Sequence, residues 1–588
     1  SPSPSPSPPS PPPPATAVAR AFDAIALHAS PRLHEFKPQE LVNLTWAFAA
    51  AEQPAPSLFS SVATHVSGRL ADFSSMGLAL LAWAFARNPK PFPALFDSLA
   101  SEATRRASHF SPRCLEMTLG AFCRADARQP LSHSTLAPLY ASLSMVALAR
   151  IDEFSGASVA NVLWAFASAR KPSPELFSAA AAAAASRLDT MTPRDIALTL
   201  SAYARAEAPA HQLFVAVSHL LPARVSSFKP TDIAQTALAV AMAGHARVGN
   251  AAVLPALLRE ARLRGADAFS PREMVELLRA SALGRYRDGI LVSQLVRALP
   301  SQLRHLNANY VAGATWAAAT LSIDSPPFFD ALGAEVERRG MHDFTTRDLA
   351  HLVWALSRQP SAPHRHARLF LAAAEATARG GVRECCLSHL SMLLASLSST
   401  GHATPALLRA VEQRLTARKG ECEALTPKQL CAVADAFAAH AHAQTHAHAL
   451  TCTVQQQQSR PQQQQSRPQQ QQSQPQQQQL QPQQQQSRPQ QKQSQPQQQQ
   501  SQPQQQQSQP QQKQSQQKQK QSQQKQKQQQ TQQQVELWAL LEARARSVSA
   551  QELSDAEASR LCDALLKAGV APPEQLQRQR RSGGGGGG

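Results

Sequence analysis

Residues 36–49 of this chain read FKPQELVNLTWAFA, and the same stretch returns along the sequence with small changes. It reappears as FSSMGLALLAWAFA, FSPRCLEMTLGAFC, FSGASVANVLWAFA and MTPRDIALTLSAYA. Eleven copies, most of them 37 or 38 residues apart, begin at Phe36, Phe73, Phe110, Phe154, Met191, Phe228, Phe269, Leu306, Phe344, Cys385 and Leu425. A period of this length over most of a chain indicates a protein that is built from stacked structural repeats.

Each copy carries the pattern of a helix with one buried face. Counted from its first residue, apolar side chains recur five, eight and twelve positions later, as at Val159, Val162 and Phe166. These positions fall on one side of an α-helix. Several copies also begin with a hydroxyl residue, a proline and an acid, as between Thr192 and Asp195. This is a capping box with a proline at the first helical position, so we expect a capped helix in each copy.

A second helical segment follows the first within each unit. It opens about 22 residues after the start of the copy with a proline and a Leu-Phe pair, which ends at Phe59, Phe96 and Phe177 in three copies. Aromatic residues make up only 5% of the chain and alanine is abundant, so helix formers outnumber strand formers. We therefore predict an all-α fold, a right-handed α-solenoid of about twelve helical hairpins of 37 to 38 residues.

The low-complexity segments divide the chain further. A Gln-rich block interrupts one hairpin, because VELWALLEARAR resumes the pattern with Leu537 and Trp538, and a twelfth copy starts at Leu553. We expect a disordered Pro/Ser tract over 1–15, the solenoid over 16–453, a disordered Gln-rich insert over 454–534, a final repeat over 535–578 and a disordered basic, glycine-rich tail over 579–588. The insert is either an association element or an inert spacer.

Charge and cysteine content restrict the class of protein. The chain has 58 basic and 40 acidic residues; nine of the basic ones lie in the Gln-rich block, which leaves 49 against 40 elsewhere. This surplus favours a polyanionic partner. Eight cysteines form no CxxC pair, so we expect reduced and mostly packed thiols. No run of 18 apolar residues occurs, and we predict no membrane span.

Catalytic signals are weak. The sequence has no nucleophile elbow, glycine-rich phosphate loop or zinc-ligand spacing. A histidine-rich stretch holds His440, His442, His446 and His448, but no cysteine or acid completes a metal site there. We predict that the protein is not an enzyme and has no cofactor, bound metal or small-molecule substrate.

The period, the W-A-F-A first helix and the second-helix motif around Pro572, Pro573 and Leu576 together resemble the octotricopeptide repeat family. Its members are algal organelle RNA factors, and similar repeats occur in FAST-kinase-like RNA-binding proteins. The resemblance covers residues 21–450 and 535–578. It implies a sequence-specific single-stranded RNA-binding protein that acts on the translation, processing or stability of an organelle transcript. A chloroplast location is favoured over a mitochondrial one, although no targeting peptide is visible in this chain.

Related solenoids read about one base per repeat through side chains that vary between copies. Positions three and seven of each copy lie four residues apart, on a stripe beside the buried face. We predict that these columns contact RNA, as the pairs Gln39 and Asn43, Thr231 and Gln235, Arg272 and Glu276, Arg347 and His351, and as the single residues Arg113, Asn161, Arg194, Asn309 and Lys428.

Two alternatives accompany this prediction. Five of the six tryptophans stand at position ten, at Trp46, Trp83, Trp164, Trp316 and Trp354. We favour packing between repeats for them over base stacking, because other copies replace Trp without loss of the pattern. The alternative for the whole protein is a protein-binding scaffold of the HEAT or armadillo kind, with protein partners also expected at the Gln-rich insert.

Overall fold

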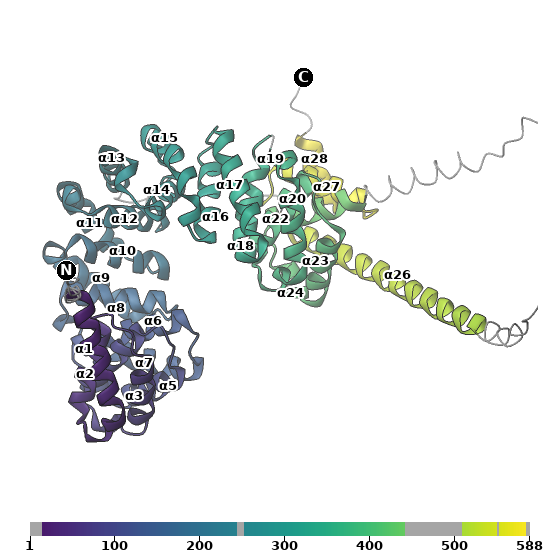
Figure 1. Ribbon diagram of the computed structural model, residues 1–588. Helices are drawn as coiled ribbons and strands as arrows, with labels where there is room; N and C mark the ends of the chain where they lie inside the picture. The colour runs from purple at the N-terminus through teal and green to yellow at the C-terminus, as the bar shows by residue number, and fades with distance from the viewer. Residues whose placement is uncertain (1–13, 244–251, 361, 442–507, 550–551, 584–588) are drawn as a thin grey trace, which may run out of the picture. The chain divides into compact units, whose positions relative to one another are not determined.

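The computed structural model describes residues 14–243, 252–360, 362–441, 508–549 and 552–583, and within these ranges the chain is all-helical without a strand (Figure 1). The prediction of an all-α repeat fold is confirmed at this level. The chain divides into two compact units, residues 1–338 and 339–588, which are described separately below.

In the first unit the repeated motif forms one layer of helices. From α2 to α14, each of these first helices packs against the first helix of the next copy. They are α2 (Pro38–Ala50), α4 (Ser75–Arg87), α6 (Pro112–Arg128), α8 (Gly156–Ser168), α10 (Pro193–Ala206), α12 (Pro230–Met242), α14 (Pro271–Leu283) and α16 (Ala308–Thr320).

The second helices of the hairpins form the other layer of this unit. From α1 to α13, each packs against the second helix of the next hairpin. They are α1 (Pro14–Ala29), α3 (Pro56–Ser67), α5 (Pro93–Arg105), α7 (His133–Ala149), α9 (Pro174–Arg187), α11 (His211–Arg224), α13 (Val253–Arg264), α15 (Gly289–Ala298) and α17 (Pro326–Arg339). Short 3₁₀ turns lead into the next copy: η1 (Ser30–Glu35), η2 (Leu70–Asp72), η3 (Ala107–His109), η4 (Ile151–Glu153), η5 (Leu188–Thr190), η6 (Val225–Ser227), η8 (Ala266–Ala268), η9 (Leu299–His305) and η10 (Met341–Asp343).

The capping residues and the apolar residues of the motif have the structural roles that the sequence predicts. At the start of α10, the Asp195 amide donates to Thr192 Oγ1 at 3.3 Å and the Thr192 amide donates to Asp195 Oδ2 at 3.0 Å. Val159, Val162 and Phe166 are buried on the inner face of α8. The caps satisfy amides that the first turn leaves without partners, and the apolar face holds the helix against its neighbours.

An aromatic ladder connects consecutive repeats. The aromatic residue at position twelve packs edge-on against an aromatic residue 26 positions earlier, on the second helix of the preceding hairpin, with ring centroids 4.8 to 5.3 Å apart. The pairs are Phe22 with Phe48, Phe59 with Phe85, Phe96 with Phe122, Tyr140 with Phe166 and Phe177 with Tyr203. These rings, more than the tryptophans of position ten, provide the aromatic packing between repeats.

A second connection between repeats is made by arginine. An arginine near the end of a second helix donates to backbone carbonyl oxygens of the short turn that follows the preceding second helix, or of the residue directly after that turn. Within the described residues this holds for Arg106, Arg150, Arg187, Arg224, Arg264, Arg414 and Arg544. Part of the basic surplus is therefore structural, which reduces the weight of net charge as a sign of a polyanionic partner.

The Arg224→Met variant tests this connection. Arg224 Nη2 donates to Met191 O at 2.8 Å and Nη1 donates to Leu188 O at 3.2 Å. Methionine keeps most of the aliphatic chain but leaves both carbonyls without this donor, so we expect unfolding free energy to fall by about 2 kcal/mol. Urea denaturation followed by circular dichroism measures it. The control is Arg297→Met, because within the described part of the chain the exposed Arg297 bonds only inside its own helix, to Ser293 O; an equal loss there would contradict the assignment.

The second unit repeats the arrangement with more irregular connections. Its elements are α18 (Thr346–Ser357), α19 (Ala362–Arg365), α20 (Ala367–Ala376), a π-turn η11 (Thr377–Gly381), α21 (Val382–Glu384), α22 (Leu387–Ser399), α23 (Pro405–Ala417), α24 (Lys419–Glu423), a helix over 427–441, α26 (Ser508–Ser547), α27 (Asp555–Lys567) and α28 (Glu574–Gly583). Leu537 and Trp538 on α26 are buried, as are Leu561 and Leu565 on α27, the apolar positions expected for a further helical hairpin.

The low-complexity boundaries differ from the prediction. Residues 508–534, expected to be disordered, form the first part of α26, the long helix labelled in Figure 1. Gln and Lys are good helix formers, and the last proline of the block, Pro510, stands in the first turn of this helix. Residues 579–583 likewise belong to α28, and α1 begins at Pro14. The remaining insert, 454–507, lies outside the described residues.

Cysteine and membrane predictions can also be compared with the fold. The described cysteines are all free thiols, and all but Cys386 are buried, as predicted. Among the described helices, none combines the length and apolar character that crossing a bilayer requires. Of the histidine-rich stretch, only His440 belongs to the described residues.

Candidate nucleic-acid interface

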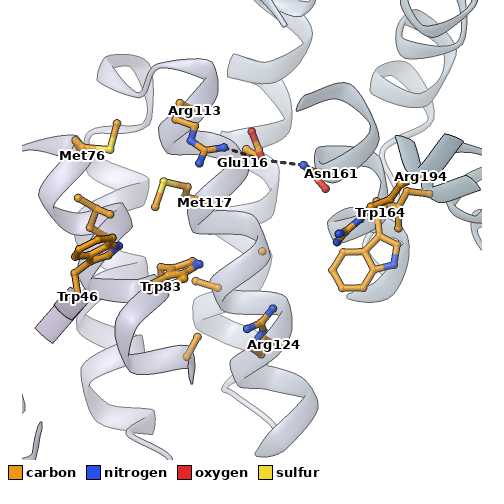
Figure 2. A pocket seen from close by; sticks show the side chains of 15 residues that line it. Trp46, Met76, Trp83, Arg113, Glu116, Met117, Arg124, Asn161, Trp164 and Arg194 are labelled. Atoms are coloured by element: carbon orange, nitrogen blue, oxygen red, sulfur yellow. Dashed lines mark hydrogen bonds and ion pairs between the residues drawn. The ribbon is translucent and has the colours of Figure 1, made fainter. Parts of the chain in front are cut away.

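Positions three, seven and ten of five consecutive first helices meet at one hollow in the first unit. The hollow has a volume of about 550 Å³, and its walls come from α2, α4, α6, α8 and α10 (Figure 2). We call it the tryptophan hollow. Its lining residues are Trp46, Met76, Leu80, Trp83, Ala86, Arg113, Glu116, Met117, Gly120, Ala121, Arg124, Asn161, Trp164, Arg194 and Leu198. Three predicted site residues, Arg113, Asn161 and Arg194, are thus brought together.

Three of the tryptophans of position ten line this hollow. Trp46 is 46% exposed, while Trp83 and Trp164 are half-buried with part of each ring facing the open space. Trp316 and Trp354 are half-buried as well. Packing between repeats stays a prediction for this position, and the three rings that line the hollow also keep part of their surface open. Exposed aromatic rings of this kind are typical stacking platforms for unpaired bases.

The rim of the hollow is basic. Of its charged lining residues, Arg113, Arg124 and Arg194 are positive and Glu116 alone is negative. Glu116 accepts from Arg113 Nη1 at 3.2 Å and from Asn161 Nδ2 at 2.8 Å, the two dashed lines in Figure 2. The glutamate is therefore engaged, whereas the exposed Arg194 has no hydrogen bond or ion pair within the described residues.

A cluster of three arginines adjoins the hollow. Arg87, Arg124 and Arg128 line a second, smaller depression of about 280 Å³ with Glu52 as its acid, and Arg124 lines both spaces. Burial, and then the charges of Arg87 and Arg128, lower the pKa of Arg124. Arg87 pairs with Glu52 at 2.9 Å and lies over the Trp83 ring at 5.0 Å. Arg128 donates to Asn88 O, so with Glu52 as the acid of the depression the three guanidinium groups keep a positive surplus that favours an anionic group here.

Other predicted residues of the first unit are engaged with neighbours. Gln39 donates to Asn43 Oδ1 at 3.0 Å, and Thr231 donates to Glu273 Oε1 at 2.6 Å. Gln39, Asn43 and Thr231 are exposed, so these hydrogen bonds can be exchanged for others. Gln235 is half-buried and Asn309 is exposed, and neither has a side-chain hydrogen bond within the described residues.

Glu276 does not fit its predicted role. It is 4% exposed and accepts from Arg272 Nε at 3.0 Å and from Tyr310 Oη at 3.0 Å. The Arg272 guanidinium also lies over the Tyr310 ring at 5.4 Å, and burial beside Glu276 raises the pKa of Tyr310 to about 12. A buried carboxylate with two donors is a structural anchor, so only Arg272 of this pair is presented to solvent.

The second unit holds the last three predicted residues. Arg347 and Lys428 are exposed, and His351 is half-buried against His389 with ring centroids 5.2 Å apart. Burial, followed by the charge of Arg347, lowers the pKa of His389. At the end of α18, Arg358 lies over the Trp354 ring at 5.3 Å, the same pairing that Arg87 and Trp83 make in the first unit.

Sequence reasoning missed position fourteen. Arg87, Arg124 and Arg358 stand there, one helical turn beyond the tryptophan position. Positions three, seven, ten and fourteen form one continuous helical stripe, so the 3.6-residue period could have included them. The sequence alone did not single out position fourteen, because the contact between arginine and tryptophan there depends on how the two side chains are placed.

Fold and site together define an all-helical repeat protein with an aromatic and basic surface hollow. No protein-family model matches the chain, and no curated protein matches it at a significant level.

Proposed function

We propose that this protein binds single-stranded RNA in a sequence-specific manner. The observation that supports this most is the tryptophan hollow, in which three indole rings and three arginines face one open space. An unpaired strand offers flat bases to the rings and phosphates to the arginines, whereas a duplex keeps its bases stacked inside. The arrangement needs no chemical step, and the protein is proposed to be a binding factor.

Sequence preference would come from the side chains that differ between repeats. Positions three and seven supply amide, hydroxyl and guanidinium groups, such as Gln39, Asn43, Gln235 and Arg194, that can pair with base edges. In the proposal, about twelve units form a right-handed solenoid, and one base per repeat gives a footprint of about ten nucleotides.

The proposed setting is an organelle, a chloroplast in preference to a mitochondrion. The resemblance of the repeat to the octotricopeptide family supports this setting. There the protein would hold a transcript segment open for the ribosome, direct its processing or protect it from exonucleases. Immunodetection in purified organelles, with sequencing of co-purified RNA, tests it; a protein confined to other fractions, without an enriched organelle transcript, contradicts it.

Salt dependence tests the binding itself. We expect in vitro selection from RNA with a 14-nucleotide random window to enrich a sequence motif. Affinity for the selected RNA should fall about twentyfold between 50 and 200 mM salt, if about three phosphates are neutralised by arginine. Filter binding gives the values, and the same sequence annealed to its complement is the control that should bind poorly.

The alternative is a peptide-binding scaffold. Met76, Leu80, Met117 and Leu198 in the hollow favour it, because they give the lining an apolar part. A peptide docked on such a surface is held largely by apolar burial, which salt does not screen. Failure to enrich any RNA, together with a captured partner whose affinity is insensitive to salt, would support the scaffold over RNA binding.

A further inference from the structure

Position ten of α6 is occupied by Gly120, where α4 and α8 carry Trp83 and Trp164. A Cβ atom built on Gly120 has no neighbour within 4 Å, so the space over this residue is open. Since α6 packs between α4 and α8, the two indoles come from the helices on either side of Gly120, and all three residues line the hollow; Figure 2 labels both indoles. Because Gly120 has no side chain, the space above it stays open and forms part of the tryptophan hollow.

From this geometry we infer that the gap over Gly120 receives one nucleobase of the bound strand. Trp83 and Trp164 border this base, and Arg124 contacts its phosphate. The inference rests on the proposed function and assigns one nucleotide to one place. Glycine matters because a tryptophan at this position would occupy the volume that the base needs.

The charges beside the gap favour a nucleotide over an uncharged aromatic ligand. Arg124 lines the tryptophan hollow and also the depression that holds Arg87 and Arg128. Glu52 is paired with Arg87, and Glu116 is taken by Arg113 and Asn161. A ligand that joins a flat ring to an anionic group therefore matches both parts of the site.

The Gly120→Trp variant closes the gap by restoring the residue found at this position in five other repeats. The variant is expected to fold, because the site is open and glycine is the weaker helix former. We expect its affinity for the selected RNA to fall about tenfold, the effect of one lost stacking contact. Gly68→Trp is the matched control, since Gly68 is exposed at the end of α3, also has no neighbour within 4 Å and has a negative φ.

An abasic scan of the selected RNA identifies the nucleotide. With the wild-type chain, one abasic position should cost about tenfold, and with Gly120→Trp the same position should cost almost nothing more. Independent losses at every position, or unchanged binding by Gly120→Trp, would overturn the inference while leaving RNA binding intact. If the wild-type chain binds no RNA, the proposed function itself fails. If AMP or UMP binds as tightly as the selected RNA, the gap is a site for free nucleotides and the strand assignment is overturned.

Discussion

Joint replacement of Trp83 and Trp164 by alanine should lower affinity for the selected RNA about tenfold. A base stacked on aromatic side chains contributes roughly 1 to 3 kcal/mol, and the double variant removes both rings that border the base placed over Gly120. Neither indole belongs to the buried core, and both border open space, so the folded state should lose little. Fluorescence anisotropy with end-labelled RNA measures the affinity, and circular dichroism confirms the helical content.

The control for this result is Met145→Ala. Met145 is 68% exposed on α7, in the layer of second helices, and should leave RNA binding unchanged. Phenylalanine at positions 83 and 164 should restore a large part of the affinity, because a flat ring remains. Wild-type affinity in the double alanine variant, with its fold intact, would contradict base stacking in the tryptophan hollow.

Salt titration separates the aromatic contribution from the ionic one. Tryptophan carries no charge, so the double alanine variant should keep the wild-type slope of affinity against salt concentration. Arg124→Gln should instead reduce that slope by about 0.7, the contribution of one phosphate contact in a single strand. If the hollow binds a nucleic acid, loss of the tryptophans should therefore lower affinity without changing its salt dependence, whereas loss of Arg124 should reduce that dependence.

The repeat, its caps and its buried face could be predicted from the sequence because they are local. Helical period and capping depend on residues within one or two turns, as between Thr192 and Asp195 or between Val159 and Phe166. The connections between repeats could not be predicted in the same way. Arg224 reaches carbonyls 33 and 36 residues away, and such contacts depend on how successive hairpins pack.

The candidate site was predicted only in part for the same reason. A position on an exposed stripe does not reveal whether its side chain already has a partner. Glu276 lies in the predicted column, but a tyrosine 34 residues later covers it, and Asn161 is tied to a glutamate 45 residues earlier. The roles proposed for Gly120 and Arg124 depend on side chains of the neighbouring helices, which line the same hollow and which the sequence alone does not place.

Phe122→Ala should be the most destabilising single change in the first unit that we propose. Phe122 is fully buried, with its ring 5.2 Å from that of Phe96 on the preceding hairpin, nearly perpendicular to it. Removal of a buried phenyl ring leaves a cavity and costs about 3 to 5 kcal/mol. Urea unfolding, with hydrogen exchange to locate the change, should show the loss centred where α5 meets α6.

A position-ten aromatic provides the comparison for that variant. Trp46→Ala removes a larger ring, yet Trp46 is 46% exposed and its loss should cost about 1 kcal/mol or less. In a solenoid, stability is the sum of repeat energies and the energies between neighbours, so loss of Phe122 should also separate the unfolding of the hairpins on either side. Equal destabilisation by the two variants would contradict a larger packing contribution from the buried aromatic ladder than from the exposed Trp46. If the costs differ as expected, the exposed ring of Trp46 contributes little to packing and is available to a ligand.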